Sequence, residues 1–256
     1  VTGQPTRGTR TLTLDAAPDL RPGDTVELVL RDNDQRTLLN HLYADDPGDT
    51  RAITAPVSTS MIARVVSVDG PSVTIDRPLW LDVRAEWAPT LHRFEPTVSN
   101  VGIEDLAIEF PAKPYAGHFT ERGMNAIAVN AAAHCWVRNV RISNADSGIF
   151  LAGVNCTIDG LLIDSARRPS AGSTGHHAVT LGRDCLLTNF DLRTRFIHDI
   201  TVSNLSTGNV VSNGRGVALS IDHHKRAPYQ NLFCNLDAGD PSRFWASGGG
   251  ASLGRH

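Results

Sequence analysis

A cluster of histidines is the feature of this chain that most directly suggests chemistry. Five of the ten histidines fall within one stretch of 49 residues. They are His176, His177, His198, His223 and His224. An imidazole changes its charge near neutral pH, so it can take a proton from a substrate as a general base. The five histidines are therefore our first candidates for catalytic residues.

Positive charges and an aromatic residue lie close to the histidines in the sequence. Arg195 precedes one of them by three residues, and Lys225 and Arg226 follow the last of them. β-Elimination on a uronic acid needs a base to remove the proton next to the carboxylate and a cation to neutralise the charge that develops there. Ca²⁺ is an alternative to arginine or lysine in that second role. Trp245 could stack on a sugar ring, so it joins the three cations as a candidate substrate-binding residue.

Two aspartates offer a second chemistry at the same place. Asp199 and Asp222 lie 23 residues apart, and both are candidate catalytic residues. Hydrolysis of a glycosidic bond uses two carboxyl groups about 5 to 10 Å apart on either side of that bond. One aspartate on each of two neighbouring strands could meet this requirement. Asp146, in the phrase NADSGI, is a third candidate carboxylate. Hydrolysis is therefore the alternative to elimination.

A metal site is the least supported use of these residues. His176, His198 and His223 could together bind zinc or copper through their imidazoles. The chain has no HxH or HxxxH spacing to anchor such a site, and its four cysteines form no CxxC pair. We therefore expect no metal ligands among the candidate residues.

Short β-strands are the elements that would position these residues. From residue 100 onward, segments with apolar residues at alternate positions are separated by Asn, Gly, Asp and Ser, and they recur at offsets of 21 and 29 residues. A repeat of this length without helical periodicity predicts a parallel β-solenoid, whose coils stack about 4.8 Å apart. We expect Val140, Leu161 and Phe190 in one ladder. An antiparallel β-sandwich is the alternative, but the two-residue hairpins that it requires are missing.

A solenoid would bring the histidines to one side of the molecule. Three successive strands carry them, at residues 175–182, 197–203 and 216–226. Alternation along these strands predicts that Ile200 and Ile221 point inward and that Asp199, Ser220 and Asp222 point outward. The histidines and aspartates would then form the floor of a groove on a solvent-facing sheet.

Polar corners in the second half of the chain carry a family resemblance. The corner residues are Asn139, Asn155, Asn189, Asn204, Asn213 and Asn231, and the cysteines at like places in successive coils are Cys135, Cys156 and Cys185. With NADSGI, the pattern over about residues 95–250 resembles the right-handed parallel β-helix of the pectin-lyase-like superfamily. The resemblance implies three parallel sheets per coil and cleavage or epimerisation of acidic polysaccharides. The polygalacturonase branch has a catalytic aspartate in a similar phrase, followed one coil later by paired aspartates, but the next coil here reads VNCTID.

The cysteines have a structural interpretation. Because Cys135, Cys156 and Cys185 recur at 21 and 29 residues, we expect them to stack inside the solenoid as small buried thiols. Their spacing leaves a disulfide as the alternative.

Two domains are expected. Residues 1–95 are predicted to form N-terminal strands, a cap and an irregular insertion, with strands on both sides of the turns RPGD and DGP. The segment 31–60 would be a short helix or a long excursion. Residues 96–256 are predicted to form the solenoid coils, with an incomplete C-terminus.

Composition excludes several classes of partner. Lys and Arg number 24 against 27 Asp and Glu, a net charge of −3, and no dense basic run occurs, so we expect neither nucleic acid nor a membrane surface as a partner. No apolar run of about 18 residues predicts a transmembrane helix. The first residues lack the apolar stretch of a secretory signal, so an exported chain would be in its processed form.

Together these observations predict an all-β, secreted enzyme that degrades a uronate-containing polysaccharide by β-elimination. Its location would be extracellular or periplasmic and its partner an acidic polysaccharide. The alternatives are a glycoside hydrolase with paired aspartates and a non-catalytic glycan-binding or tailspike-like β-solenoid.

Overall fold

The computed structural model describes residues 1–246 and 250–253, and the chain forms two compact units. One unit comprises Val1–Pro47 and Arg51–Glu95, and the other comprises Gly48–Thr50 and Pro96–His256. In the described part of the chain, no helix is both long and apolar enough to cross a membrane. The expected incomplete C-terminus falls partly on residues 247–249 and 254–256, which lie outside the described residues.

The first unit is built on a five-stranded antiparallel sheet. Its strands are β1 (Thr11–Thr13), β2 (Thr25–Arg31), β3 (Ser58–Asp69), β4 (Ser72–Ile75) and β5 (Thr90–Arg93), in the order β1-β4-β3-β2-β5. The helices are α1 (Thr37–Leu42) and the 3-10 turn η1 (Ala85–Trp87). The DGP turn joins β3 to β4 as expected. The strands around RPGD do not pair with each other, because β1 pairs with β4 and β2 pairs with β3 and β5.

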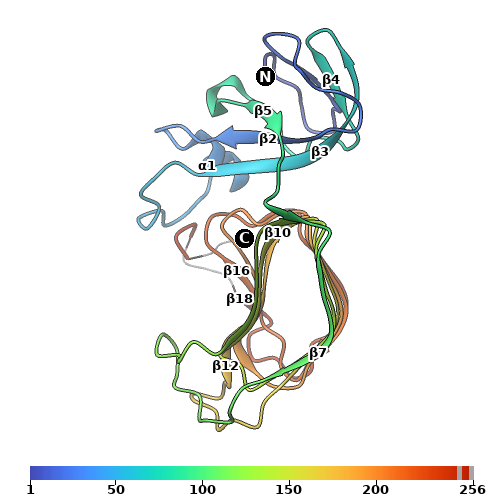
Figure 1. Cartoon of the computed structure of the whole chain (residues 1–256). Helices are drawn as coiled ribbons and strands as arrows, with labels where there is room; N and C mark the ends of the chain where they lie inside the picture. Colours follow the sequence, from blue (N-terminus) through green and yellow to red (C-terminus); the bar gives the residue numbers. More distant parts are fainter. Residues whose placement is uncertain (247–249, 254–256) are drawn as a thin grey trace. The chain divides into compact units, whose positions relative to one another are not determined.

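The second unit is a parallel β-solenoid (Figure 1). Its seven-stranded sheet consists of β6 (Val98–Ser99), β8 (Asn125–Ala133), β10 (Ser147–Val154), β12 (Gly175–Arg183), β14 (Phe196–Ser203), β16 (Ile221–His224) and β18 (Trp245–Ala246). Its six-stranded sheet consists of β7 (Gly102–Glu109), β9 (Trp136–Ser143), β11 (Thr157–Asp164), β13 (Leu186–Leu192), β15 (Val210–Gly216) and β17 (Leu232–Asp237). The chain alternates between the two sheets, so each coil contributes one strand to each.

Strand register confirms the predicted fold class. Leu161 pairs with Val140 on one side and with Phe190 on the other, in parallel strands. The sandwich alternative is therefore wrong for this unit. All three side chains are buried in one apolar cluster that runs along the solenoid axis. Cys135, Cys156 and Cys185 are buried in the same cluster as free thiols.

The described residues of this unit form two parallel sheets, whereas the family resemblance implies three, and the strands of one sheet bend in their interior. Each strand of the six-stranded sheet has a residue with left-handed backbone in its interior. These residues are Asp105, Asn139, Gly160, Asn189, Asn213 and Asn235. Asparagine and glycine tolerate this conformation better than other residues, which explains the repeated corners. Of the six predicted asparagine corners, Asn231 alone is not left-handed, and the preceding Gln230 is.

The buried ladder makes a prediction about stability. Leu187 lies between Ile158 and Val211 of the neighbouring strands and is fully buried. Leu187→Ala should lower the free energy of unfolding by about 2 to 5 kcal/mol, because it leaves a cavity in the core. Leu232 on β17 is 54% exposed, so the matched Leu232→Ala should change it by less than about 1 kcal/mol. Urea unfolding followed by circular dichroism measures both, and equal losses would contradict the assigned register.

Candidate active site

The structure brings the histidines of β12 and β14 together. His177 and His198 are register partners on these adjacent strands, and their rings stack with centroids 5.0 Å apart. The rings of His176 and His177 stack at 4.1 Å, and those of His176 and His198 lie 5.6 Å apart. His177 Nδ1 lies 3.0 Å from Thr201 Oγ1. The row of imidazoles expected from the sequence is therefore present on the seven-stranded sheet.

Asp222 on β16 lies between two of the histidines. Its Oδ2 is 3.1 Å from Nδ1 of His198 and 3.7 Å from Nδ1 of His224. Neither Asp222 Oδ2 nor His198 Nδ1 has a hydrogen bond of good geometry, although both atoms are buried. Burial raises the pKa of Asp222 to about 6, against the opposite influence of Arg243 and Lys225.

Burial also keeps the imidazoles neutral. It lowers the pKa of His177 and of His198 to about 3, and the neighbouring histidines, joined by Arg243 at His198, act in the same direction because they disfavour a further positive charge. The pKa of His176 and of His224 is lowered for the same reason, although Glu121 opposes the shift at His176. The row therefore offers unprotonated ring nitrogens at neutral pH.

A loop between β7 and β8 adds residues that sequence reasoning missed. The ring centroids of His118 and His176 lie 4.5 Å apart, and the ring of Phe119 stacks on His118. Glu121 Oε1 lies 3.1 Å from His176 Nδ1 and accepts a hydrogen bond of 2.8 Å from the Tyr115 hydroxyl. The length of this connection is the signal that could have found them, because long loops on a scaffold of short corners often carry function.

Asp146 anchors this loop and is not exposed to a groove. Its carboxylate accepts the backbone N–H groups of Arg122 and Met124 and pairs with Arg167 at 2.8 Å. Both side chains of the ion pair are fully buried. Arg167 also donates to the carbonyl of Lys113 in the same loop. The candidate carboxylate in NADSGI therefore holds the segment that carries His118 and Glu121.

The outward orientation expected for Asp199 is wrong, whereas Ser220 lines a pocket at the surface of this sheet. Asp199 is buried, and its carboxylate accepts the backbone N–H groups of Phe196 and Ser220. Burial raises the pKa of Asp199 to about 6. Asp199 and Ile200 are consecutive and both buried, so inward–outward alternation breaks at this point of β14. Asp199 does not face the groove beside Asp222.

The remaining candidates are dispersed. His223 shares the register of the buried Val202, and its ring contacts Phe233 and Trp245. Trp245 is half exposed. Arg226 lies in the turn after β16, where its N–H donates to the carbonyl of Ala251.

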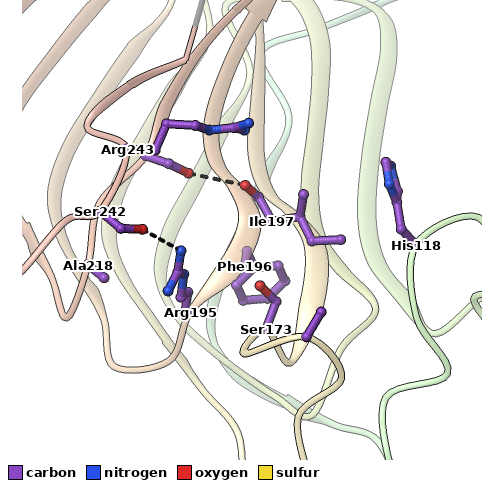
Figure 2. A pocket seen from close by; sticks show the side chains of 10 residues that line it. His118, Ser173, Arg195, Phe196, Ile197, Ala218, Ser242 and Arg243 are labelled. Carbon is purple, nitrogen blue, oxygen red and sulfur yellow. Dashed lines mark hydrogen bonds between the residues drawn. The ribbon is translucent and has the colours of Figure 1, made fainter.

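Two pockets that share His118 and Arg243 border the histidine row. The first has a volume of about 500 Å³. Figure 2 shows His118 on the side of this pocket opposite Ser242 and Arg195, whose guanidinium donates to Ser242 Oγ at 2.7 Å. The second has a volume of about 470 Å³. Its lining includes His118, Phe119, His198, Asp222, His224, Lys225, Arg243 and Trp245. Arg226 lines neither pocket.

Comparison with solved structures gives matches to phage proteins. Three of them are tailspikes. The tailspike gp49 of Pseudomonas phage LKA1 is 14% identical with a TM-score of 0.44, covering 91% of this chain and 44% of that chain. The tailspike gp61 of Pseudomonas phage phi297 is 14% identical with a TM-score of 0.43, and the match covers 89% of this chain and 47% of that chain. The Gp54 tailspike of Acinetobacter baumannii bacteriophage AP22, solved with A. baumannii capsular saccharide, is 9% identical with a TM-score of 0.45, covering 94% and 51%.

This chain thus spans about half the length of the tailspike chains that it matches. No family model and no curated protein matches it.

Proposed function

We propose that this chain binds an acidic polysaccharide in the groove formed by the two pockets and cleaves it by β-elimination, with His224 as the base. The observation that carries the proposal is that one pocket gathers neutral imidazoles, the carboxylate of Asp222 and the cations Lys225 and Arg243. These are the two components of the reaction, a base and positive charge for the uronate carboxylate. An enzyme with this substrate would be secreted and would act outside the cell or in the periplasm.

His224 is the imidazole best placed to take the proton. One third of its side chain is exposed, against 13% for His198. A ring whose pKa is about 3, as for His177 and His198, is a weak base at neutral pH. Asp222 lies beside His224 and would stabilise the imidazolium that forms when the proton is taken up.

The cations of the groove supply the second component. Arg243 and Lys225 act on the charge of Asp222 and line the pocket that holds His224. Arg195 lines the adjoining pocket, next to Arg243. A chain of uronate residues could therefore meet positive charge in both pockets. Hydrolysis is less well supported, because the burial of Asp199 removes one of the two carboxyl groups that it needs.

Glycan binding without cleavage is the second candidate function. Phe119 is 81% exposed and Trp245 is 50% exposed, and both line the pocket of His224. Exposed aromatic rings of this kind provide stacking surfaces for sugars. They would hold a polysaccharide whether or not the imidazoles react with it.

A panel of acidic polysaccharides separates these functions. We expect incubation with at least one uronate-containing polymer to produce the ultraviolet absorbance of a new C=C bond, which only elimination creates. Reducing ends without that absorbance would indicate hydrolysis instead. Retention of the polymer without any product would support the binding module, and neutral polysaccharides serve as the control because they lack the carboxylate.

A further inference from the structure

We propose that His118, His176 and His198 form a binding site for a divalent transition-metal ion, with Zn²⁺ as the best match. One ring nitrogen of each residue lies within 4.8 Å of the others. Within residues 1–246 and 250–253, this is the one set of three histidine, cysteine or acidic side chains whose ligand atoms converge in this way. The three residues come from the loop before β8, from β12 and from β14, so the fold brings them together from separate coils.

The surroundings of two rings match those of metal-bound histidines. Glu121 lies 3.1 Å from Nδ1 of His176, and the hydroxyl of Tyr115 donates to Glu121. Asp222 lies 3.1 Å from Nδ1 of His198. A histidine that binds a metal through one nitrogen usually presents the other to a carboxylate, which fixes the ring and makes it a better ligand. A carboxylate oxygen thus lies 3.1 Å from Nδ1 of each ring, although at His198 the pair lacks the geometry of a hydrogen bond.

The ligand set favours zinc over calcium. Three imidazoles provide nitrogen ligands, which suit Zn²⁺, whereas Ca²⁺ takes oxygen ligands. Three protein ligands would also leave a coordination position of a tetrahedral ion open. Calcium as the neutraliser of the uronate carboxylate stays a prediction.

The site lies at the wall of the proposed substrate groove. His118 and His198 both line the 470 Å³ pocket, together with Arg243 and Lys225. If the proposed function holds, an ion at this place would add to the positive charge that faces the uronate carboxylate. The metal site itself does not depend on that function, since it rests on the geometry of the three rings and two carboxylates.

Metal titration of the protein tests the inference without any substrate. Metal-free protein prepared without a polyhistidine tag should bind one Zn²⁺ per chain in calorimetry, and Co²⁺ should give the visible absorption bands of a tetrahedral nitrogen site. His176→Ala and His118→Ala should each abolish this binding. Glu121→Gln keeps all three ligands and should weaken binding by about 10- to 100-fold. His92→Ala removes an exposed histidine of the N-terminal unit and should leave binding unchanged.

Three results would overturn the inference: no zinc bound by the parent, zinc bound equally well by the two ligand variants, or an equal effect of the His92 control. Circular dichroism of each variant shows that lost binding is not lost folding, and Glu121→Gln provides a test with every ligand in place. The titration contains no substrate, so it is independent of the polysaccharide panel. Stoichiometric zinc binding by a protein that gives no elimination product in that panel would contradict the proposed function alone. Elimination without zinc binding would contradict the metal site alone.

Discussion

His224→Ala is expected to reduce the turnover of a uronate polysaccharide by about 100- to 10,000-fold, which is the usual contribution of a general base. His224 faces the pocket with Lys225 and Arg243, and Asp222 lies 3.7 Å from its ring. Removing the ring takes away the group that accepts the proton, while the cations that bind the carboxylate stay. The Michaelis constant should therefore change little, because a base acts mainly in the transition state. Initial rates of ultraviolet absorbance over a range of polymer concentrations measure both quantities.

A second histidine variant controls for general effects of losing an imidazole. His134 is exposed at a left-handed corner between β8 and β9. Asparagine tolerates that backbone conformation, so His134→Asn should keep the parent's rate. If His224→Ala retains full turnover on a polymer that the parent cleaves, the assignment of the base is wrong. The proposed zinc site does not include His224, so the variant should still bind one ion per chain.

The sequence predicts the ladder of the solenoid well because the ladder follows from local rules. Alternating apolar residues and the tolerance of asparagine for left-handed backbone are both properties of single residues and their neighbours. The pairing of Val140, Leu161 and Phe190 and the left-handed corners at Asn139 and Asn189 are consequences of those rules. The offsets between repeats then suffice to place His177 beside His198.

The site is less predictable because parts of it break those rules. At Asp199 and Ile200 two consecutive residues are buried, so counting by alternation assigns Asp199 to the wrong side. The same count assigns His223 to the side of Ile221, in agreement with its register partner, the buried Val202, so the clustering of histidines in the sequence overstated the size of the row.

Loop residues are missed for a different reason. His118, Glu121 and Arg243 lie in connections between strands, where no periodicity relates position to orientation. Their places are set by contacts distant in sequence, such as the hydrogen bonds from Arg122 and Met124 to Asp146. For the same reason the sequence suggested His223 as the third histidine of a conceivable metal site, whereas the zinc site proposed above includes His118 instead.

The anchor of that loop gives the largest expected effect on stability. Arg167→Met should lower the free energy of unfolding by about 3 to 5 kcal/mol, because it leaves the carboxylate of Asp146 buried without its charged partner. The guanidinium also donates to the carbonyls of Lys113 and Asn144, and these bonds are lost with it. Urea unfolding followed by circular dichroism measures the change.

Two further variants show whether the buried charge is the cause. Asp191 and Arg215 form an ion pair at 2.7 Å in which the Arg215 side chain is 61% exposed, so Arg215→Met should cost less than about 1 kcal/mol. Adding Asp146→Asn to Arg167→Met removes the unpaired charge and should restore part of the lost stability. A double variant less stable than Arg167→Met alone would mean that the hydrogen bonds of Asp146 to the loop matter more than its charge. If Arg167→Met and Arg215→Met lower the free energy of unfolding equally, the Asp146–Arg167 pair is not buried as described.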